Sequence, residues 1–208
     1  MSNVSAAVEA TLSGLAGGIS PLRPGLFARP GPTFRATLTI DAQSDAPGAS
    51  RIFRTGTPTD AVIRFASAHD SVNGDRSSVR TACIKLPDYH GPQRDQDFLL
   101  ASSADGIPFH HAALPADGPG DRIYSSLWLY LAGVEPVVFG LGSDKLSNQN
   151  EVTPGDRFAF LTAGMLSRFA PAGTLDIRDE IPDPTVRFAA RNSGGGLRPL
   201  PPALFYRS

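Results

Sequence analysis

The four histidines of this sequence are the side chains best suited to acid–base chemistry. His69 is followed directly by Asp70, in a polar segment that continues into the turn Asn73-Gly74-Asp75. An imidazole beside a carboxylate could act as an acid or base at the mouth of a pocket. However, adjacent side chains on an extended chain point to opposite sides. The sequence leaves His69 with two interpretations, a catalytic acid or base and an exposed loop residue.

Two adjacent histidines, His110 and His111, follow the apolar run Ile107-Pro108-Phe109. On a regular strand they could not easily bind one metal ion together, and the additional ligands of a zinc or iron site are missing at the required spacing. One ring could point into a pocket while the other meets solvent. We take His110 as a candidate catalytic base and predict no metal site.

Composition and missing motifs exclude several classes of function. A net charge of −1, from 19 basic and 20 acidic residues, argues against binding of nucleic acid. The single cysteine, Cys83, cannot form an internal disulfide and is expected to be a small buried apolar residue. No Gly-x-Ser-x-Gly elbow is present. Without a secretory leader or a long apolar run, we expect a cytoplasmic protein that does not bind membranes.

The elements that would position these residues are mainly strands. Glycine (21) and proline (19) separate short apolar runs, a pattern typical of a many-stranded β protein. Period-two alternation is clearest over 34–40. Further strands are expected at 61–66, 79–86, 97–101, 157–163, 173–178 and 185–190, with a last strand or docked tail at 204–206. Helical spacing of apolar residues predicts helices over 3–17 and 123–134.

These elements predict one domain over residues 1–208, with an N-terminal helix and arm over 1–32. The predicted fold class is α+β but mainly β, an antiparallel β-barrel of about eight strands with a few packed helices. Closure into a barrel removes exposed sheet edges, which suits this number of short strands.

Three consecutive segments resemble the barrel of the catalase superfamily. Residues 57–66 end in Arg64-Phe65-Ala66, residues 79–86 carry Arg80 before a small apolar run that closes on Lys85-Leu86, and residues 97–103 read Asp-Phe-Leu-Leu-Ala-Ser-Ser. A glycine-rich turn at 25–31 precedes them, as in the family. The resemblance covers about residues 25–110 and implies a catalase-like barrel.

The resemblance implies haem as the cofactor, and it also shows what this chain lacks. Catalases bind the haem iron through a tyrosinate and use a histidine and an asparagine on the opposite side. In this sequence Phe27 stands where the histidine is expected, and Ser102 stands where the asparagine is expected. Tyr206 is the only tyrosine near the C-terminus, and no arginine precedes it by four residues. Hydrogen peroxide turnover by the family route is therefore expected to fail.

Two arginines complete the set of candidates that the resemblance provides. Arg64 and Arg80 match strand positions from which a guanidinium could bind haem propionates, although outward-facing positions are equally compatible with the pattern. The candidate cofactor-binding residues are thus Arg64, Arg80, Phe27 and Tyr206. The candidate catalytic residues are His69, Ser102 and His110.

Two hypotheses about function follow. The first is a diverged catalase-like haem protein, a peroxidase-type oxidoreductase acting on an organic peroxide or another apolar small molecule. The alternative is a haem-free barrel that binds a hydrophobic small molecule, either as a binding protein or as a non-haem enzyme with a pocket histidine. Apolar residues in the N-terminal arm, Leu22, Leu26 and Phe27, leave a homodimer open.

Overall fold

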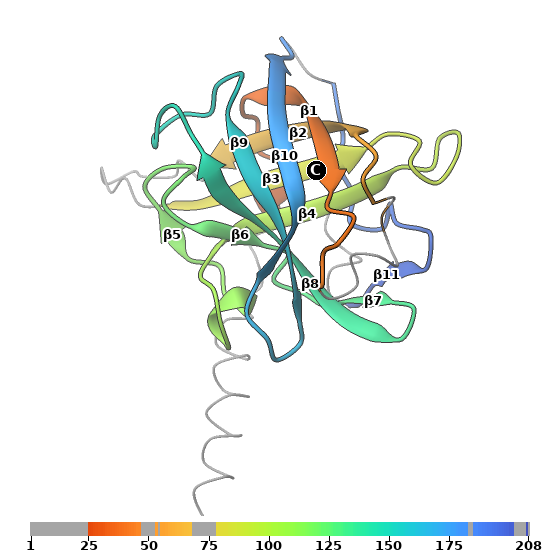
Figure 1. Cartoon of the computed structure of the whole chain (residues 1–208). Coiled ribbons are helices and arrows are strands. Elements are labelled where there is room, and N and C mark those ends of the chain that lie inside the picture. Colours follow the sequence, from red (N-terminus) through yellow and green to blue (C-terminus); the bar gives the residue numbers. More distant parts are fainter. Residues whose placement is uncertain are drawn as a thin grey trace, which may run out of the picture.

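Eight antiparallel strands close into a barrel (Figure 1). The computed structural model describes residues 25–46, 53, 55–67, 78–182, 185–201 and 207. The barrel strands are β1 (Thr33–Ile40), β2 (Thr59–Ser67), β3 (Ser78–Leu86), β4 (Gln96–Ser103), β6 (Ile123–Ser125), β8 (Glu135–Lys145), β9 (Arg157–Gly164) and β10 (Ala170–Glu180). Pairing of β1 with β10 closes the circle, so the barrel has no free edge between these strands.

Short elements extend the barrel at its ends. β5 (Pro115–Ala116) pairs with β3, while β7 (Tyr130–Ala132) pairs with β8 and β11 (Leu197–Pro199) pairs with β7. Two single-turn 3₁₀ helices, η1 (Leu26–Ala28) and η2 (Phe109–His111), are the helices among the described residues. No helix in the described ranges is long and apolar enough to cross a membrane.

The predicted antiparallel barrel is confirmed, but the helix predicted over 123–134 is wrong. That segment forms β6, a tight turn and β7, with Tyr124 and Tyr130 both buried. The hydroxyls of Ser125 and Ser126 bond to main-chain groups in and around the turn, which competes with helical hydrogen bonding. Main-chain pairing with β4 and β8 then favours the extended conformation.

The strand predicted over 185–190 is also absent as a regular strand. Its residues run extended outside the barrel, with one isolated bridge between Ala189 and Arg207. Their apolar side chains pack on the outer face of the barrel, which explains the apolar pattern in this segment. The helix predicted over 3–17 and the tail over 204–206 lie outside the described residues.

Aromatic side chains fill the inside of the barrel. The Phe139 ring lies at centroid distances of 4.7 Å from Phe98, 5.1 Å from Tyr130 and 6.1 Å from both Phe53 and Phe160. Edge-to-face and tilted pairs at these distances are favourable, and each ring removes a large apolar area from water. The barrel interior is therefore a packed core.

A second apolar cluster covers the outer face of β3 and β4. Leu26 and Phe27 of η1 join Cys83, Leu99 and Phe188 there. Cys83 is 1% exposed, and burial raises the pKa of its thiol to about 12. The expectation of a small buried apolar residue at this position is confirmed, and a thiol in this state is a poor nucleophile.

A buried ionic network holds the segment around 186–192 against the barrel. Lys85 Nζ lies 2.7 Å from Asp95 Oδ2 and 2.9 Å from Asp97 Oδ1. The main-chain N–H of Ala189 and the side-chain amide of Asn192 both donate to Asp97 Oδ2 at 2.8 Å. Because the Asp97 side chain is fully buried, its charge loses hydration, and these donors offset that desolvation cost. The network therefore ties the segment around 186–192 to β3 and β4.

Candidate functional site

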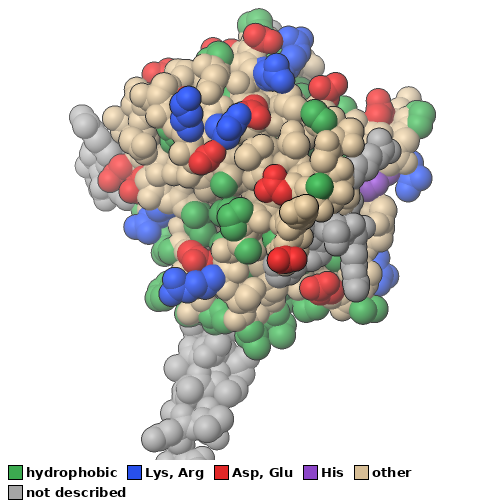
Figure 2. Space-filling view, in the orientation of Figure 1, with side chains coloured by type: hydrophobic (Ala, Val, Ile, Leu, Met, Phe, Trp, Pro, Cys, Tyr) green, Lys and Arg blue, Asp and Glu red, His purple; other side chains and the backbone are tan. Residues whose placement is uncertain are grey.

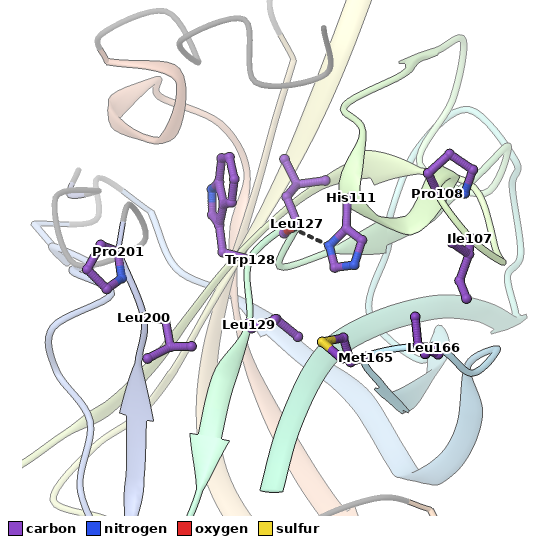
Figure 3. A pocket seen from close by; sticks show the side chains of 10 residues that line it. All are labelled: Ile107, Pro108, His111, Leu127, Trp128, Leu129, Met165, Leu166, Leu200 and Pro201. Carbon is purple, nitrogen blue, oxygen red and sulfur yellow. Dashed lines mark hydrogen bonds between the residues drawn. The ribbon is translucent and has the colours of Figure 1, made fainter. Parts of the chain in front are cut away.

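An apolar pocket of about 290 Å³ lies beside the barrel wall, near the ends of β6 and β9. Four segments form it: the η2 region, the turn between β6 and β7, the connection between β9 and β10, and the residues after β11 (Figure 3). The side chains from the first two segments are Ile107, Pro108, His111, Leu127, Trp128 and Leu129. Met165, Leu166, Leu200 and Pro201 complete the lining.

The turn between β6 and β7 is held in a strained conformation. The N–H of Trp128 donates to the carbonyl of Ser126 at 2.6 Å, two residues back, and Leu127 between them has φ +59°. Such a γ-turn is rare for a branched side chain such as leucine. The N–H of Leu127 donates to Ser125 Oγ at 3.0 Å, and that hydroxyl donates to the carbonyl of His110. The surrounding hydrogen bonds therefore fix the turn against η2.

The two adjacent histidines complete this link. His111 Nδ1 lies 2.8 Å from the carbonyl oxygen of Leu127, as the dashed line in Figure 3 shows. A carbonyl only accepts hydrogen bonds, so Nδ1 of His111 carries the proton. His110 Nε2 lies 2.8 Å from His111 Nε2. In a neutral pair His110 must donate here, which leaves His110 Nδ1 as a bare acceptor without a partner.

Burial keeps this histidine pair neutral. Loss of solvent, together with the neighbouring His111, lowers the pKa of His110 to about 4. Burial also lowers the pKa of His111, against the opposing effect of its bond to the Leu127 carbonyl. Near neutral pH the pocket wall at His111 is uncharged.

Exposed apolar side chains surround the pocket. Leu166 is 74% exposed and Met165 is 45% exposed at the β9–β10 connection, while Phe109 and Ile107 are exposed on the facing loop. Figure 2 shows hydrophobic side chains gathered at this end of the molecule. Exposed apolar groups clustered at one site, instead of scattered, mark a binding surface.

Sequence reasoning missed most of this pocket. Trp128 belongs to the segment predicted as a helix over 123–134, and it lies instead in the turn that lines the cavity. The signal that could have located the site is Met165-Leu166, an apolar pair between Gly164 and Ser167 where a hairpin tip would normally be polar.

Arg64 and Phe27, two of the predicted cofactor-binding residues, do lie together, but on the outer face of β2 and β3. Arg64 Nη2 donates to the Phe27 carbonyl at 2.7 Å, and the guanidinium stacks 4.8 Å from the Phe188 ring centroid. The neighbouring Ile63 and Phe65 point into the barrel because side chains alternate along a strand. Arg64 therefore holds the outer apolar cluster together.

Arg80 and Ser102 form a second neighbourhood. The N–H of Arg80 donates to Ser102 Oγ at 2.9 Å, and Ser102 Oγ donates to the carbonyl of Leu114. This buried hydroxyl therefore accepts one hydrogen bond and donates its proton to another, both with main-chain groups of the protein. The Arg80 side chain donates to the carbonyls of Ala116 and Asp117. A cavity of about 190 Å³ lies beside Arg80, but these bonds already engage its guanidinium.

His110 forms the third neighbourhood, and it does not line the apolar pocket, although His111 does. The predicted roles of Ser102 and His110 in catalysis stay predictions. His69 and Tyr206 lie outside the described residues. In the described ranges, no group of three or more His, Cys, Asp or Glu side chains is placed to hold a metal ion.

Comparison with solved structures places this architecture among catalase-type barrels. The crystal structure of a fungal catalase matches with a TM-score of 0.57 at 11% sequence identity. The aligned region covers 85% of this chain and 56% of that catalase, so the chain corresponds to little more than half of the larger protein. At this identity the likeness concerns the fold alone. No family model matches the chain, and no curated protein matches it.

The described residues do not fit a haem group bound in the way catalases bind it. Tyr124 and Tyr130 are buried in the barrel interior, and burial raises the pKa of each phenol, which opposes formation of a tyrosinate ligand. The His110 ring is fully buried, and its centroid lies 4.1 Å from that of His111, so no porphyrin face can approach it. The other aromatic rings of the interior pack against one another.

Proposed function

We propose that this protein binds an apolar small molecule in the pocket beside His111, on a catalase-type barrel whose interior serves as the structural core. The observation that carries the proposal is the pocket of about 290 Å³, almost entirely apolar and surrounded by exposed apolar side chains. Concave apolar sites near this size are typical of small-molecule ligands. The fixed γ-turn and the neutral histidine pair indicate that this side of the pocket is already formed before a ligand binds.

The single tryptophan of the chain makes the proposal directly testable. Trp128 lies in the pocket wall, so its fluorescence should change when a ligand enters. We expect apolar alcohols and hydrocarbons to give a saturable change in emission and to raise the melting temperature. Ligand at about 100 times its Kd stabilises a fold by about 2.7 kcal/mol. Glycerol is the matched polar control and should give neither effect.

A variant separates binding in the pocket from non-specific adsorption. Leu129 lines the cavity, and Leu129→Asp would place a carboxylate in it. We expect this change to abolish the fluorescence response to apolar ligands. Val134→Asp is the matched control, because Val134 is 89% exposed and does not line the pocket. If both variants respond like the unmodified chain, the pocket is not the binding site.

A haem-dependent, peroxidase-type oxidoreductase is the second candidate function, supported by the fold that the chain shares with a catalase. Its test is titration with haemin, followed by the Soret band. A stoichiometric band that disappears in Tyr206→Phe would support it and would place the axial ligand in the part of the chain outside the described residues. No saturable band would leave the apolar-ligand proposal as the better supported one.

A further inference from the structure

The chemistry of the pocket wall limits which apolar molecules it can hold. Among the described residues that line the pocket, none carries a charge, and His111 is the one with a titratable side chain. Both ring nitrogens of His111 are already used, Nδ1 by the Leu127 carbonyl and Nε2 by His110. The ring therefore presents no free donor to a ligand, and burial disfavours its charged form.

The charged groups nearest in sequence to the lining do not change this balance. Arg168, on the β9–β10 connection, is not part of the lining, and its Nη1 lies 3.9 Å from Asp105 Oδ2 before η2. Arg168 and Asp105 offset each other in charge, and the side chain of Arg198, two residues before Leu200, is exposed on β11 and does not line the pocket. Neither the turn at 127–129 nor the residues 200–201 contribute a titratable side chain.

From these observations we infer that the ligand is uncharged along the part that enters the pocket, and that the site discriminates against fatty acids in their ionised form. This inference rests on the proposed function. A carboxylate loses its hydration when it enters an apolar cavity, and with no cation in the lining to replace the water its ionised form is strongly disfavoured. An alcohol or ester of the same length carries no charge, so its desolvation costs much less, and a hydrocarbon has no polar group to desolvate.

Decan-1-ol and decanoate provide the test, because they share one apolar chain and differ at the head group. Followed by Trp128 fluorescence at about pH 7.5, decanoate should bind about 100-fold more weakly than decan-1-ol, the ratio expected when burial raises a carboxyl pKa by about two units. Decanoate affinity should rise as the pH falls towards 5, by up to about 100-fold in all, because the protonated acid enters far more readily than the ionised form. Decan-1-ol affinity should stay constant over the same range.

A rim variant should reverse the discrimination. Met165 is 45% exposed at the pocket, so Met165→Lys can bring an ammonium to the mouth without disturbing the core. We expect decanoate to bind at least about tenfold more tightly to this variant, since an ion pair replaces lost hydration. Val134→Lys adds the same charge away from the pocket and should leave decanoate binding unchanged.

The outcomes separate the two proposals. Equal affinities for decanoate and decan-1-ol at about pH 7.5 would overturn the discrimination against charge, while binding in the pocket would stand. A preference for decan-1-ol that Met165→Lys does not alter would also overturn it, because the head group would then lie away from the rim. No response to either molecule would instead remove the proposed function itself.

Discussion

The inside of the barrel and the pocket outside it are both apolar, yet they differ in how completely their apolar side chains are buried. Inside, Phe53, Phe98, Phe139 and Phe160 contact one another and are almost completely buried. At the pocket, Met165 and Leu166 remain exposed around an open cavity. The difference teaches that aromatic side chains fill the closed barrel of this chain, so its apolar pocket is built from connections outside the barrel.

The largest expected effect comes from removing an aromatic ring of the barrel interior, which tests whether the interior is the structural core. Phe139 contacts rings on several strands, so Phe139→Ala should leave a cavity and lower the free energy of unfolding by about 3–5 kcal/mol. Urea unfolding followed by circular dichroism measures this change. A loss below about 1 kcal/mol would mean that the interior is not the structural core.

Acid provides the next largest effect, and it acts on the wall of the pocket. The pKa of His110 falls from 6.5 to about 4 on folding, so between these values the unfolded chain binds more protons than the folded one. Stability is therefore fully present above about pH 6.5 and declines as the pH falls towards 4, by about 1–2 kcal/mol once solvent screening is included.

The control for this effect is His110→Asn, measured by urea unfolding at a series of pH values. Because the chain has other histidines, the prediction concerns the difference between the two proteins. We expect the slope of stability against pH to be smaller in the variant. Identical slopes would show that His110 titrates in the folded chain as it does in the unfolded one.

Arg64 tests whether the outer face of the barrel is structural or binds a cofactor. Its guanidinium bonds to the Phe27 carbonyl and stacks on Phe188, so Arg64→Met should lower stability by about 1–2 kcal/mol. Thermal unfolding with and without haemin measures both effects. A variant that is as stable as the unmodified chain but has lost haemin binding would contradict the structural role and restore the predicted propionate contact.

The barrel could be predicted from the sequence because strand patterns are local. Alternation over 34–40 and the apolar runs of β2, β3 and β4 each reflect one strand with a buried face. The helix prediction for 123–134 was wrong because Leu127, Leu131 and Val134 happen to follow helical spacing. Pairing with β4 and β8 decides the conformation of this segment. Such pairing joins residues far apart in the chain, and single-segment patterns cannot report it.

The candidate site was harder to predict because it is assembled from connections. The pocket joins four segments between 107 and 201, and none carries a catalytic motif. Sequence reasoning selected His110 and left His111 for solvent, whereas the structure buries His110 completely and places His111 in the pocket wall. Which ring faces a cavity depends on the η2 turn and on the Leu127 carbonyl, and neither is visible in the residue types.

The smallest expected effect on stability comes from the exposed rim of the pocket, in contrast to the large effect expected in the barrel interior. Leu166 is 74% exposed, so Leu166→Ala should change the free energy of unfolding by less than about 0.5 kcal/mol. Because Leu166 also lines the pocket, the same change should weaken binding of decan-1-ol severalfold, about the loss of one apolar contact of roughly 1 kcal/mol. Urea unfolding and Trp128 fluorescence measure the two quantities on one sample. Val134→Ala shortens an apolar side chain that is even more exposed and lies away from the pocket, and it should alter neither quantity. A Leu166→Ala protein that loses stability but binds normally would reverse the assignment, because the exposed rim would then belong to the core and not to the ligand.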